Sequence, residues 1–393
     1  MQNYYLFQKK NKKHFCIKSI ISKEINSSSR RALLISGIFV GLALLSKYHS
    51  FFLWVGAILY ILFFNRKWLN TKELYISIFI SLLIFLPVLI WNYQNQFISF
   101  TFQGERVNII SSGIRLDYFI TELIGEVFYT NPVTFALILI AIFKFKTINE
   151  TDTDIKRFLL IFSLPNILIF LLFSLFRKTL PHWTGPGYLV LLILTAIYIS
   201  EKRTYKIFQI PISIFISYIT ILIVLVLGYL QINYSFIPQK KTTSLAINLG
   251  KDDITLDMFG WKQILDKFKK LNDKYVEENV FGINVPIISN KWYNAGHLDY
   301  YVGRIMNKNI YSAGNLNDIR NYIFVNRNRG DLLVGEDAYY ISPSRDFRKP
   351  DELLSLSFEK IIPLDTIKVY RAGEVAENVF IFKLRKYTGN RFY

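Results

Sequence analysis

The chain has 393 residues, and this length alone corresponds to two or three domains. Hydrophobic residues make up 52% of it, and the formal net charge is +18 at pH 7. A single cysteine, Cys16, excludes an intrachain disulfide and a cysteine-based metal site, and the four histidines show no metal-ligand spacing.

The positive charge belongs mostly to the N-terminal part of the chain. Residues 1–232 carry 23 of the 47 basic residues but only 10 of the 29 acidic ones. Lys and Arg orient the loops of membrane proteins toward the cytoplasm, so this excess indicates membrane topology and no nucleic-acid partner. Residues 1–31 are basic and polar without an apolar core, which predicts a cytoplasmic tail and no signal peptide.

Seven apolar segments follow, and they predict an α-helical, multi-span membrane domain over residues 32–232. The segments are 32–46, 50–64, 73–91, 128–145, 158–176, 184–200 and 207–231. Only Lys47 to His49 separate the first two, so these form either a tight hairpin or one long bent helix.

The basic connections predict the orientation of these segments. Lysine-rich connections at 65–72, 144–157 and 201–206 alternate as cytoplasmic loops do. Seven crossings that start from a cytoplasmic tail place residues 233–393 outside. We therefore expect a multi-pass protein of the plasma (inner) membrane with an extracytoplasmic C-terminal domain.

Several cations lie on the outward connections, where the positive-inside rule disfavours them. They are Lys47, Arg106, Arg115, Arg177 and Lys178. These residues either bind an anion at the outer interface or only snorkel and contact lipid headgroups.

The outward connection 92–127 contains a predicted amphipathic helix. Glu122 and Glu126 lie four residues apart on one helical face, and apolar side chains occupy another. This pattern is typical of an interfacial helix, ended by Asn131-Pro132. The two acids either flank the mouth of an active site or form a solvated face.

Residues 233–393 predict a small, soluble α/β domain because strand and helix patterns alternate. We expect helices at 260–275 and 291–303, and strands at 285–290, 321–327, 338–342, 361–371 and 378–384. His297 and Asp299 are two apart in a predicted helix and point in different directions, so we interpret the pair as structural. No catalytic site is apparent in this domain.

Four stretches in this order resemble the bacterial members of glycosyltransferase family 39, the ArnT-like and dolichyl-phosphate-mannose–protein mannosyltransferase-like group of GT-C membrane enzymes. They are "GIFVGLALLSKYHSFFLWVGAILYILF", "LPVLIWNYQNQFISFTFQGER", "PHWTGPGYLVLLIL" and, in the C-terminal domain, "FGWKQILDKFKKL" with "YNAGHLDYYVG". The resemblance covers about residues 32–390.

The resemblance implies inverting transfer of a sugar from a polyprenyl-phosphate carrier to an extracytoplasmic acceptor: a cell-envelope glycan, lipid or protein. We expect no cofactor and single out no metal-ligating residues, and the sequence leaves metal dependence open. Cations would stabilise the leaving phosphate of the donor, and the residues expected to do so are Lys47, Arg106, Arg177, Lys178 and His182. Trp183 is expected to anchor the chain at the membrane interface or to hold the isoprenoid.

One departure concerns the catalytic base. Members of this family carry an aspartate in the first outer loop, and residues 1–31 contain neither that span nor that aspartate, so we expect about a third of a typical member to be missing at the N-terminus. The candidate substitutes are Glu105, Glu122 and Glu126, none of which matches the family position. A truncated enzyme would keep its affinity for the donor but transfer slowly.

The alternative from another class is a non-catalytic membrane protein whose outer domain binds a polymer or a partner. A transporter is disfavoured because the predicted spans contain no Asp or Glu apart from Glu73, the first residue of the 73–91 segment.

Overall fold

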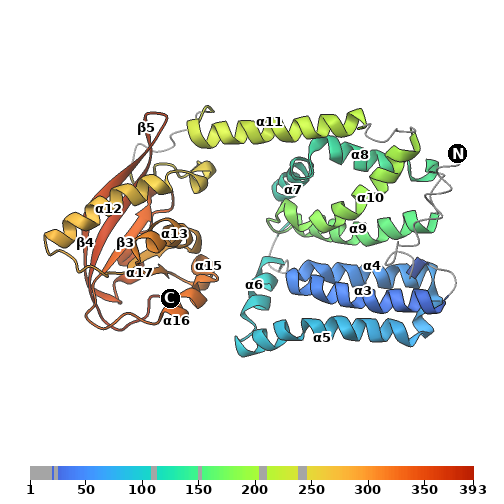
Figure 1. Ribbon diagram of the computed structural model, residues 1–393, viewed down its shortest axis with the longest axis horizontal. Helices are drawn as coiled ribbons and strands as arrows, with labels where there is room; N and C mark the ends of the chain where they lie inside the picture. The colour runs from blue at the N-terminus through green and yellow to red at the C-terminus, as the bar shows by residue number, and fades with distance from the viewer. Residues whose placement is uncertain (1–19, 22–24, 108–112, 149–152, 203–209, 238–245) are drawn as a thin grey trace. The chain divides into compact units, whose positions relative to one another are not determined.

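The computed structural model describes residues 20–21, 25–107, 113–148, 153–202, 210–237 and 246–393 (Figure 1). The chain divides into two compact units, Met1–Leu222 and Ile223–Tyr393. The described part of the first unit is helical, and the second unit contains a five-stranded sheet.

Four described helices are long and apolar enough to cross a membrane: α3 (Ser27–Ser46), α5 (Lys72–Gln94), α9 (Thr153–Ser174) and α11 (Ile212–Tyr234). A fifth span results if α7 (Leu116–Tyr129) and α8 (Pro132–Phe143), which meet at a bend of 100°, are counted as one. Two further apolar helices, α4 (Phe51–Phe64) and α10 (Gly185–Lys202), are shorter. These helices indicate a multi-pass membrane protein, whereas the count of seven crossings stays a prediction.

The first two predicted segments form a hairpin and not one bent helix. α3 and α4 are separate helices joined by the 3₁₀ turn η1 (Tyr48–Ser50), and they lie side by side (Figure 1). α3 begins at Ser27, within the predicted tail, because Asn26 and Ser29 form a reciprocal capping box there.

Small residues let α3 and α5 approach closely. A Cβ on Gly37 would lie 2.4 Å from the Ser77 hydroxyl oxygen. Ser77 donates a hydrogen bond to the Leu33 carbonyl, and Ser81 donates one to the Gly37 carbonyl. Such small-residue contacts with interhelical hydrogen bonds are a common way for helices to associate inside a membrane.

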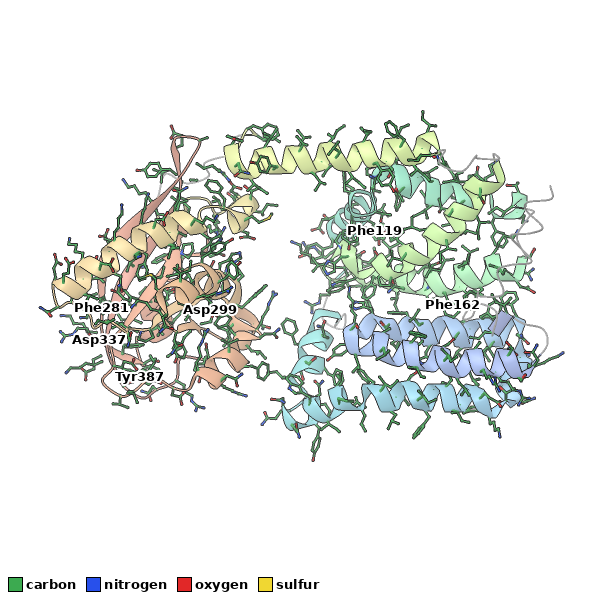
Figure 2. The ribbon with its side chains drawn as sticks, in the orientation of Figure 1. Phe119, Phe162, Phe281, Asp299, Asp337 and Tyr387 are labelled. Carbon is green, nitrogen blue, oxygen red and sulfur yellow. The ribbon has the colours of Figure 1, made fainter. Side chains whose placement is uncertain are left out.

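A glycine likewise lets α4 approach α9 closely. A Cβ on Gly56 would lie 3.0 Å from the Cα of Phe162, whose place on α9 is labelled in Figure 2. α9 also packs against α10, so the hairpin α3–α4 and the helices α9 and α10 form one helical body. The ends of these helices position the candidate site.

The sheet of the second unit has the order β2-β1-β3-β5-β4. Its strands are β1 (Ile287–Asn290), β2 (Ile310–Ala313), β3 (Ala338–Pro343), β4 (Phe358–Arg371) and β5 (Glu374–Tyr387). β1 pairs in parallel with β2 and β3, and β5 pairs antiparallel with β3 and β4. α12 (Trp261–Glu277) and α13 (Trp292–Leu298) contribute to the core on one face, and α17 (Pro350–Leu354) contributes on the other.

One predicted strand of this unit is wrong. Residues 321–327 belong to the helix α16 (Tyr322–Arg329). Tyr322 and Asn326 lie four apart and are both buried, which is helical periodicity, and the Asn326 amide bonds both backbone groups of Ser312 in β2. The strand β2 (Ile310–Ala313) was not predicted.

His297 and Asp299 point to different neighbours, as the sequence predicts, and their structural role stays an interpretation. The His297 ring stacks on Trp261 with the ring centroids 4.6 Å apart, and its Nδ1 lies 2.8 Å from the Tyr293 carbonyl oxygen. Asp299 instead accepts two hydrogen bonds from Arg329, at 2.7 and 2.8 Å. The two side chains therefore serve different contacts.

Candidate active site

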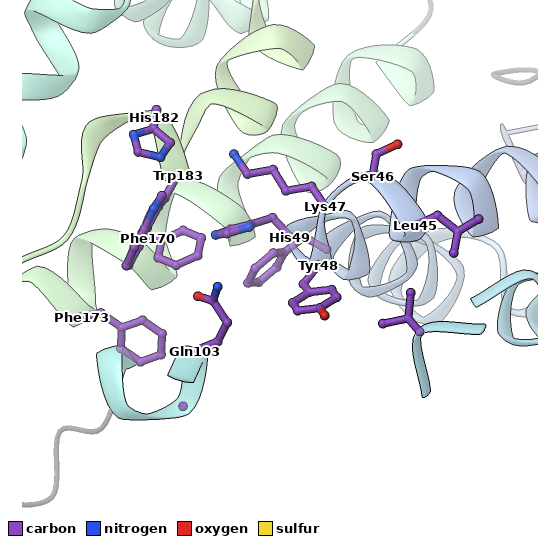
Figure 3. Close-up of a pocket in the computed structure, with 13 residues that line it drawn as sticks. Leu45, Ser46, Lys47, Tyr48, His49, Gln103, Phe170, Phe173, His182 and Trp183 are labelled. Carbon is purple, nitrogen blue, oxygen red and sulfur yellow. The ribbon is translucent and has the colours of Figure 1, made fainter. Parts of the chain in front are cut away.

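A cavity of about 660 Å³ lies where α3 ends and where the chain turns from α9 to α10 (Figure 3). Its lining combines two basic connections with apolar and aromatic walls. The lining residues are Leu45, Ser46, Lys47, Tyr48, His49, Phe52, Val88, Gln103, Gly104, Phe170, Phe173, His182 and Trp183.

The short connection between α3 and α4 presents Lys47 and His49 to this cavity. α3 stops at Ser46 because Lys47 adopts an extended backbone (φ −158°). The Ser50 hydroxyl then donates a hydrogen bond to the Ala43 carbonyl at 2.9 Å, and the Tyr48 hydroxyl bonds the Ser99 hydroxyl at 2.7 Å. These two hydrogen bonds hold the turn against α3 and against α6 (Ile98–Val107). The Lys47 side chain extends toward His182 (Figure 3).

His49 lies among aromatic rings of α9 and of the following turn. Its ring centroid is 5.0 Å from that of Phe170 and 6.0 Å from that of Trp183. The His49 Nδ1 atom is buried and has no hydrogen-bond partner among the residues that the structure describes. Lys47 makes no ion pair in the described part of the chain, so the cavity has a cationic lining residue next to apolar surface.

The turn η4 (Pro181–Trp183) supplies the opposite wall, and a buried asparagine holds it. Asn166 of α9 is almost fully buried and accepts a hydrogen bond from the Gly187 N–H at 3.2 Å. Its amide lies 3.5 Å from the Trp183 carbonyl. The Thr184 hydroxyl donates to the Pro181 carbonyl at 2.8 Å. These bonds fix His182 and Trp183 at the cavity.

The helix α7 covers the other side of this turn. A Cβ on Gly125 would lie 2.4 Å from Cγ of Pro181, so the absence of a side chain permits this contact. The apolar face of α7 points outward, with Ile120 53% and Phe128 70% exposed, while Glu122 and Glu126 are buried. The interpretation of the two acids as a solvated face is therefore wrong.

The acids are buried and not solvated because α10 supplies a hydrogen-bond donor to Glu126. The Tyr188 hydroxyl donates a 2.7 Å hydrogen bond to Glu126, and both residues are buried. An apolar outer face is what lipid favours, and the acids then turn toward polar groups inside the protein. Neither Glu122 nor Glu126 belongs to the lining of the cavity.

The predicted phosphate-binding residues separate into three groups. Lys47 and His182 line the cavity, whereas Arg177 and Lys178 precede η4 and do not. The side chains of Arg106 and of the candidate base Glu105 lie outside the described residues. The sequence did not single out His49 or Tyr188. The signal for His49 was its position in a short polar break, beside Lys47, between two apolar runs.

The arrangement is suited to a ligand with an anionic head and an apolar tail. Ammonium and imidazole groups donate hydrogen bonds to phosphate oxygens, and aromatic walls contact hydrocarbon. In the described part of the chain, no three His, Cys, Asp or Glu side chains come together as metal ligands.

Comparison with known proteins points in the same direction. Residues 19–91, which include Lys47 and His49, match the family model of the dolichyl-phosphate-mannose-protein mannosyltransferases. The chain is also 24% identical, over 155 residues, to the lipid A galacturonosyltransferase RgtD of Rhizobium johnstonii. That alignment covers 39% of this chain, and the chain spans about a third (32%) of the length of that relative. No solved structure matches the chain.

Both matches are to glycosyltransferases: one to a family of mannosyltransferases, the other to a galacturonosyltransferase. The family match includes the α3–α4 connection that carries one basic wall of the cavity. The similarity and the cavity therefore involve the same residues.

Proposed function

We propose that the protein is a membrane glycosyltransferase that takes its sugar from a polyprenyl-phosphate carrier and transfers it to an extracytoplasmic acceptor. The observation that carries this proposal is the cavity between the α3–α4 connection and η4. It brings Lys47 and His182 together with Phe170, Phe173 and Trp183, although these residues are far apart in the sequence.

The chemistry requires a site that stabilises charge on a leaving group. When the bond between sugar and phosphate breaks, negative charge develops on the phosphate. The Lys47 ammonium and the His182 imidazole would donate to its oxygens, and the aromatic wall would hold the first isoprene units of the carrier. Such preorganised donors act strongly where protein and lipid exclude water.

The acceptor needs a base, and we assign none. Glu122 and Glu126 are buried behind η4 and away from the cavity lining, so in this arrangement they support the turn that carries His182. Arg177 and Lys178 lie at the start of the same turn, where they would attract an anionic carrier toward the cavity.

Transfer of labelled sugar tests the proposal. The purified chain would be reconstituted in liposomes with a polyprenyl-phosphate-linked radiolabelled sugar and membranes of the source cell as acceptor. We expect label to enter the acceptor fraction slowly, because no base is assigned. Lys47→Ala and His182→Ala should each lower the rate at least about tenfold, the usual scale for a transition-state donor.

Lys67→Ala is the matched control, because Lys67 is an exposed lysine of the turn η2 (Arg66–Asn70) and does not line the cavity. Equal rates for Lys47→Ala and Lys67→Ala would contradict the proposed role of the cavity.

A further inference from the structure

The last turn of α11 marks the level of the membrane surface in the second unit. With 23 residues this helix is about 34 Å long, close to the roughly 30 Å of a bilayer core. Tyr229 and Tyr234 near its end are aromatic residues of the kind found at membrane interfaces. Side chains that the structure holds beside this turn are therefore close to lipid headgroups.

The chain folds back on this turn directly after the helix. Ser235 adopts a left-handed backbone (φ 49°), and the Gln231 side chain bonds both backbone groups of Ile237, at 2.9 and 3.1 Å. Phe236 and Ile237 are thereby kept at the level of the last turn, where both side chains are exposed. Apolar side chains exposed at this level suit lipid better than water.

An arginine of the sheet holds a second segment against the same turn. Nη1 of Arg371, the last residue of β4, lies 3.5 Å from the carbonyl oxygen of Ile232 in α11. The same atom donates a 2.9 Å hydrogen bond to the Thr255 hydroxyl, and the guanidinium pairs with the buried Asp253. Asp253 in turn caps the 3₁₀ turn η6 (Ile254–Met258). The turn η6 is thus held next to the end of α11.

The turn η6 carries two large apolar side chains that stay mostly exposed. Ile254 is 80% exposed and Met258 is 69% exposed. Exposed apolar groups that gather in one region mark a binding surface. Together with Phe236 and Ile237, they place apolar side chains from two segments at the end of one membrane-length helix.

We infer that the second unit docks on the lipid bilayer through Phe236, Ile237, Ile254 and Met258, which enter the headgroup region around the end of α11. Lipid is the occupant because this docking surface continues the span. The contacts that hold it in place are made by the last turns of α11 itself. Such docking would fix the orientation of the second unit over the membrane, whether or not the chain transfers a sugar.

Leu356 provides a matched control position at the far end of the same sheet. It is 79% exposed, against 80% for Ile254. It lies two residues before β4, whereas Arg371, which bonds to η6, is the last residue of that strand. The 14 residues of β4 span roughly 40 Å, so docking at η6 leaves Leu356 in water.

The experiment measures the depth of a nitroxide spin label in the full chain, reconstituted in nanodiscs of phosphatidylcholine and phosphatidylglycerol. Cys16 is the only cysteine, so a Cys16→Ser background allows one label at a time. The label is attached to Ile254→Cys in one protein and to Leu356→Cys in the other. Both positions are exposed, so neither substitution disturbs a core.

We expect the label at position 254 to lie about 5–10 Å inside the headgroup boundary, the depth of interfacial apolar side chains. Oxygen should then reach it, and a water-soluble nickel complex should not. The nickel complex should reach the label at position 356 freely.

Each contrary outcome overturns the inference for a different reason. If the nickel complex reaches both positions equally, η6 faces water. If neither oxygen nor nickel reaches position 254, protein covers η6, either the first unit or a second copy of the chain. If both labels are embedded in lipid, exposed apolarity alone brings a side chain to the bilayer, and docking through η6 is refuted.

Discussion

The Tyr188 hydroxyl donates a 2.7 Å hydrogen bond to Glu126, and this bond joins α10 to α7 behind the turn that carries His182. The Glu126 Oε1 atom and the Glu122 Oε1 atom have no partner in the described part of the chain. Tyr188 therefore donates a hydrogen bond that stabilises the buried acidic face of α7.

Tyr188→Phe should destabilise the helical unit. Without the phenol hydroxyl, Glu126 loses its 2.7 Å hydrogen bond from Tyr188, and leaving a buried acceptor unpaired costs about 1–3 kcal/mol. We expect a lower thermal unfolding temperature of the detergent-solubilised protein. The control is Tyr218→Phe, since Tyr218 is 61% exposed on α11. Equal unfolding temperatures for both variants would show that the bond contributes nothing.

The two glycines of the Gly185-Pro186-Gly187 segment should respond differently to alanine. A Cβ at Gly187 would lie 2.7 Å from the Ser163 carbonyl oxygen, so Gly187→Ala must push α10 away from α9. Overpacking of this kind typically costs about 1–3 kcal/mol. At Gly185 the nearest atom is Cε1 of Tyr129 at 3.6 Å, an ordinary contact. Thermal unfolding should show a loss for Gly187→Ala only, and a loss of the same size for Gly185→Ala would count against this packing.

The free energy of unfolding of the second unit should depend on pH through the carboxyl group of Glu377. Burial raises the pKa of this carboxyl to about 7, even though Nε of Arg345 lies 3.3 Å from its Oε1 atom. The folded state then holds a proton that the unfolded state releases above about pH 4.5, so the free energy of unfolding falls as pH rises to about 7 and is constant above that. The loss amounts to roughly 3 kcal/mol at most.

Urea titrations of the full chain at several pH values measure how the free energy of unfolding depends on pH. Susceptibility of the second unit to proteolysis reports its unfolding in each titration. Glu377→Gln should be nearly flat between about pH 5 and pH 7, because the amide does not titrate. A slope for Glu377→Gln as steep as that of the unmodified protein would assign the effect to other groups.

Reporter fusions test the orientation of the membrane part. If the lysine-rich connections at 65–72, 144–157 and 201–206 are cytoplasmic and seven segments cross, the chain after Tyr234 lies outside. Alkaline phosphatase fused after Tyr234 should then be active and a fluorescent protein fused there should be dark. The opposite pair of signals would require an even number of crossings.

The sequence was informative where a local pattern determines structure. Each of the seven apolar runs contains a helix, and the strands β1, β3, β4 and β5 lie within or overlap predicted ones. α16 was missed because "NYIFVNR" has the apolar content of a strand, and only the contacts of Tyr322 and Asn326 select a helix.

The candidate site was predictable only in part. The unusual basic connections drew attention to Lys47 and His182, and both line the cavity. The burial of Glu126 was not predictable, because its partner Tyr188 is 62 positions away along the chain. For the same reason the unpartnered nitrogen of His49 appears only when α9 and η4 are placed beside it.

The central claim is that the cavity between the α3–α4 connection and η4 holds the phosphate end of a polyprenyl-phosphate sugar. Photocrosslinking with a donor that carries a photoreactive group on its first isoprene unit tests it most directly. We predict crosslinked peptides from residues 45–52 and 170–183, lost when unlabelled donor competes and weakened by Lys47→Ala. Crosslinks that map elsewhere, or that persist with excess unlabelled donor, would contradict the account.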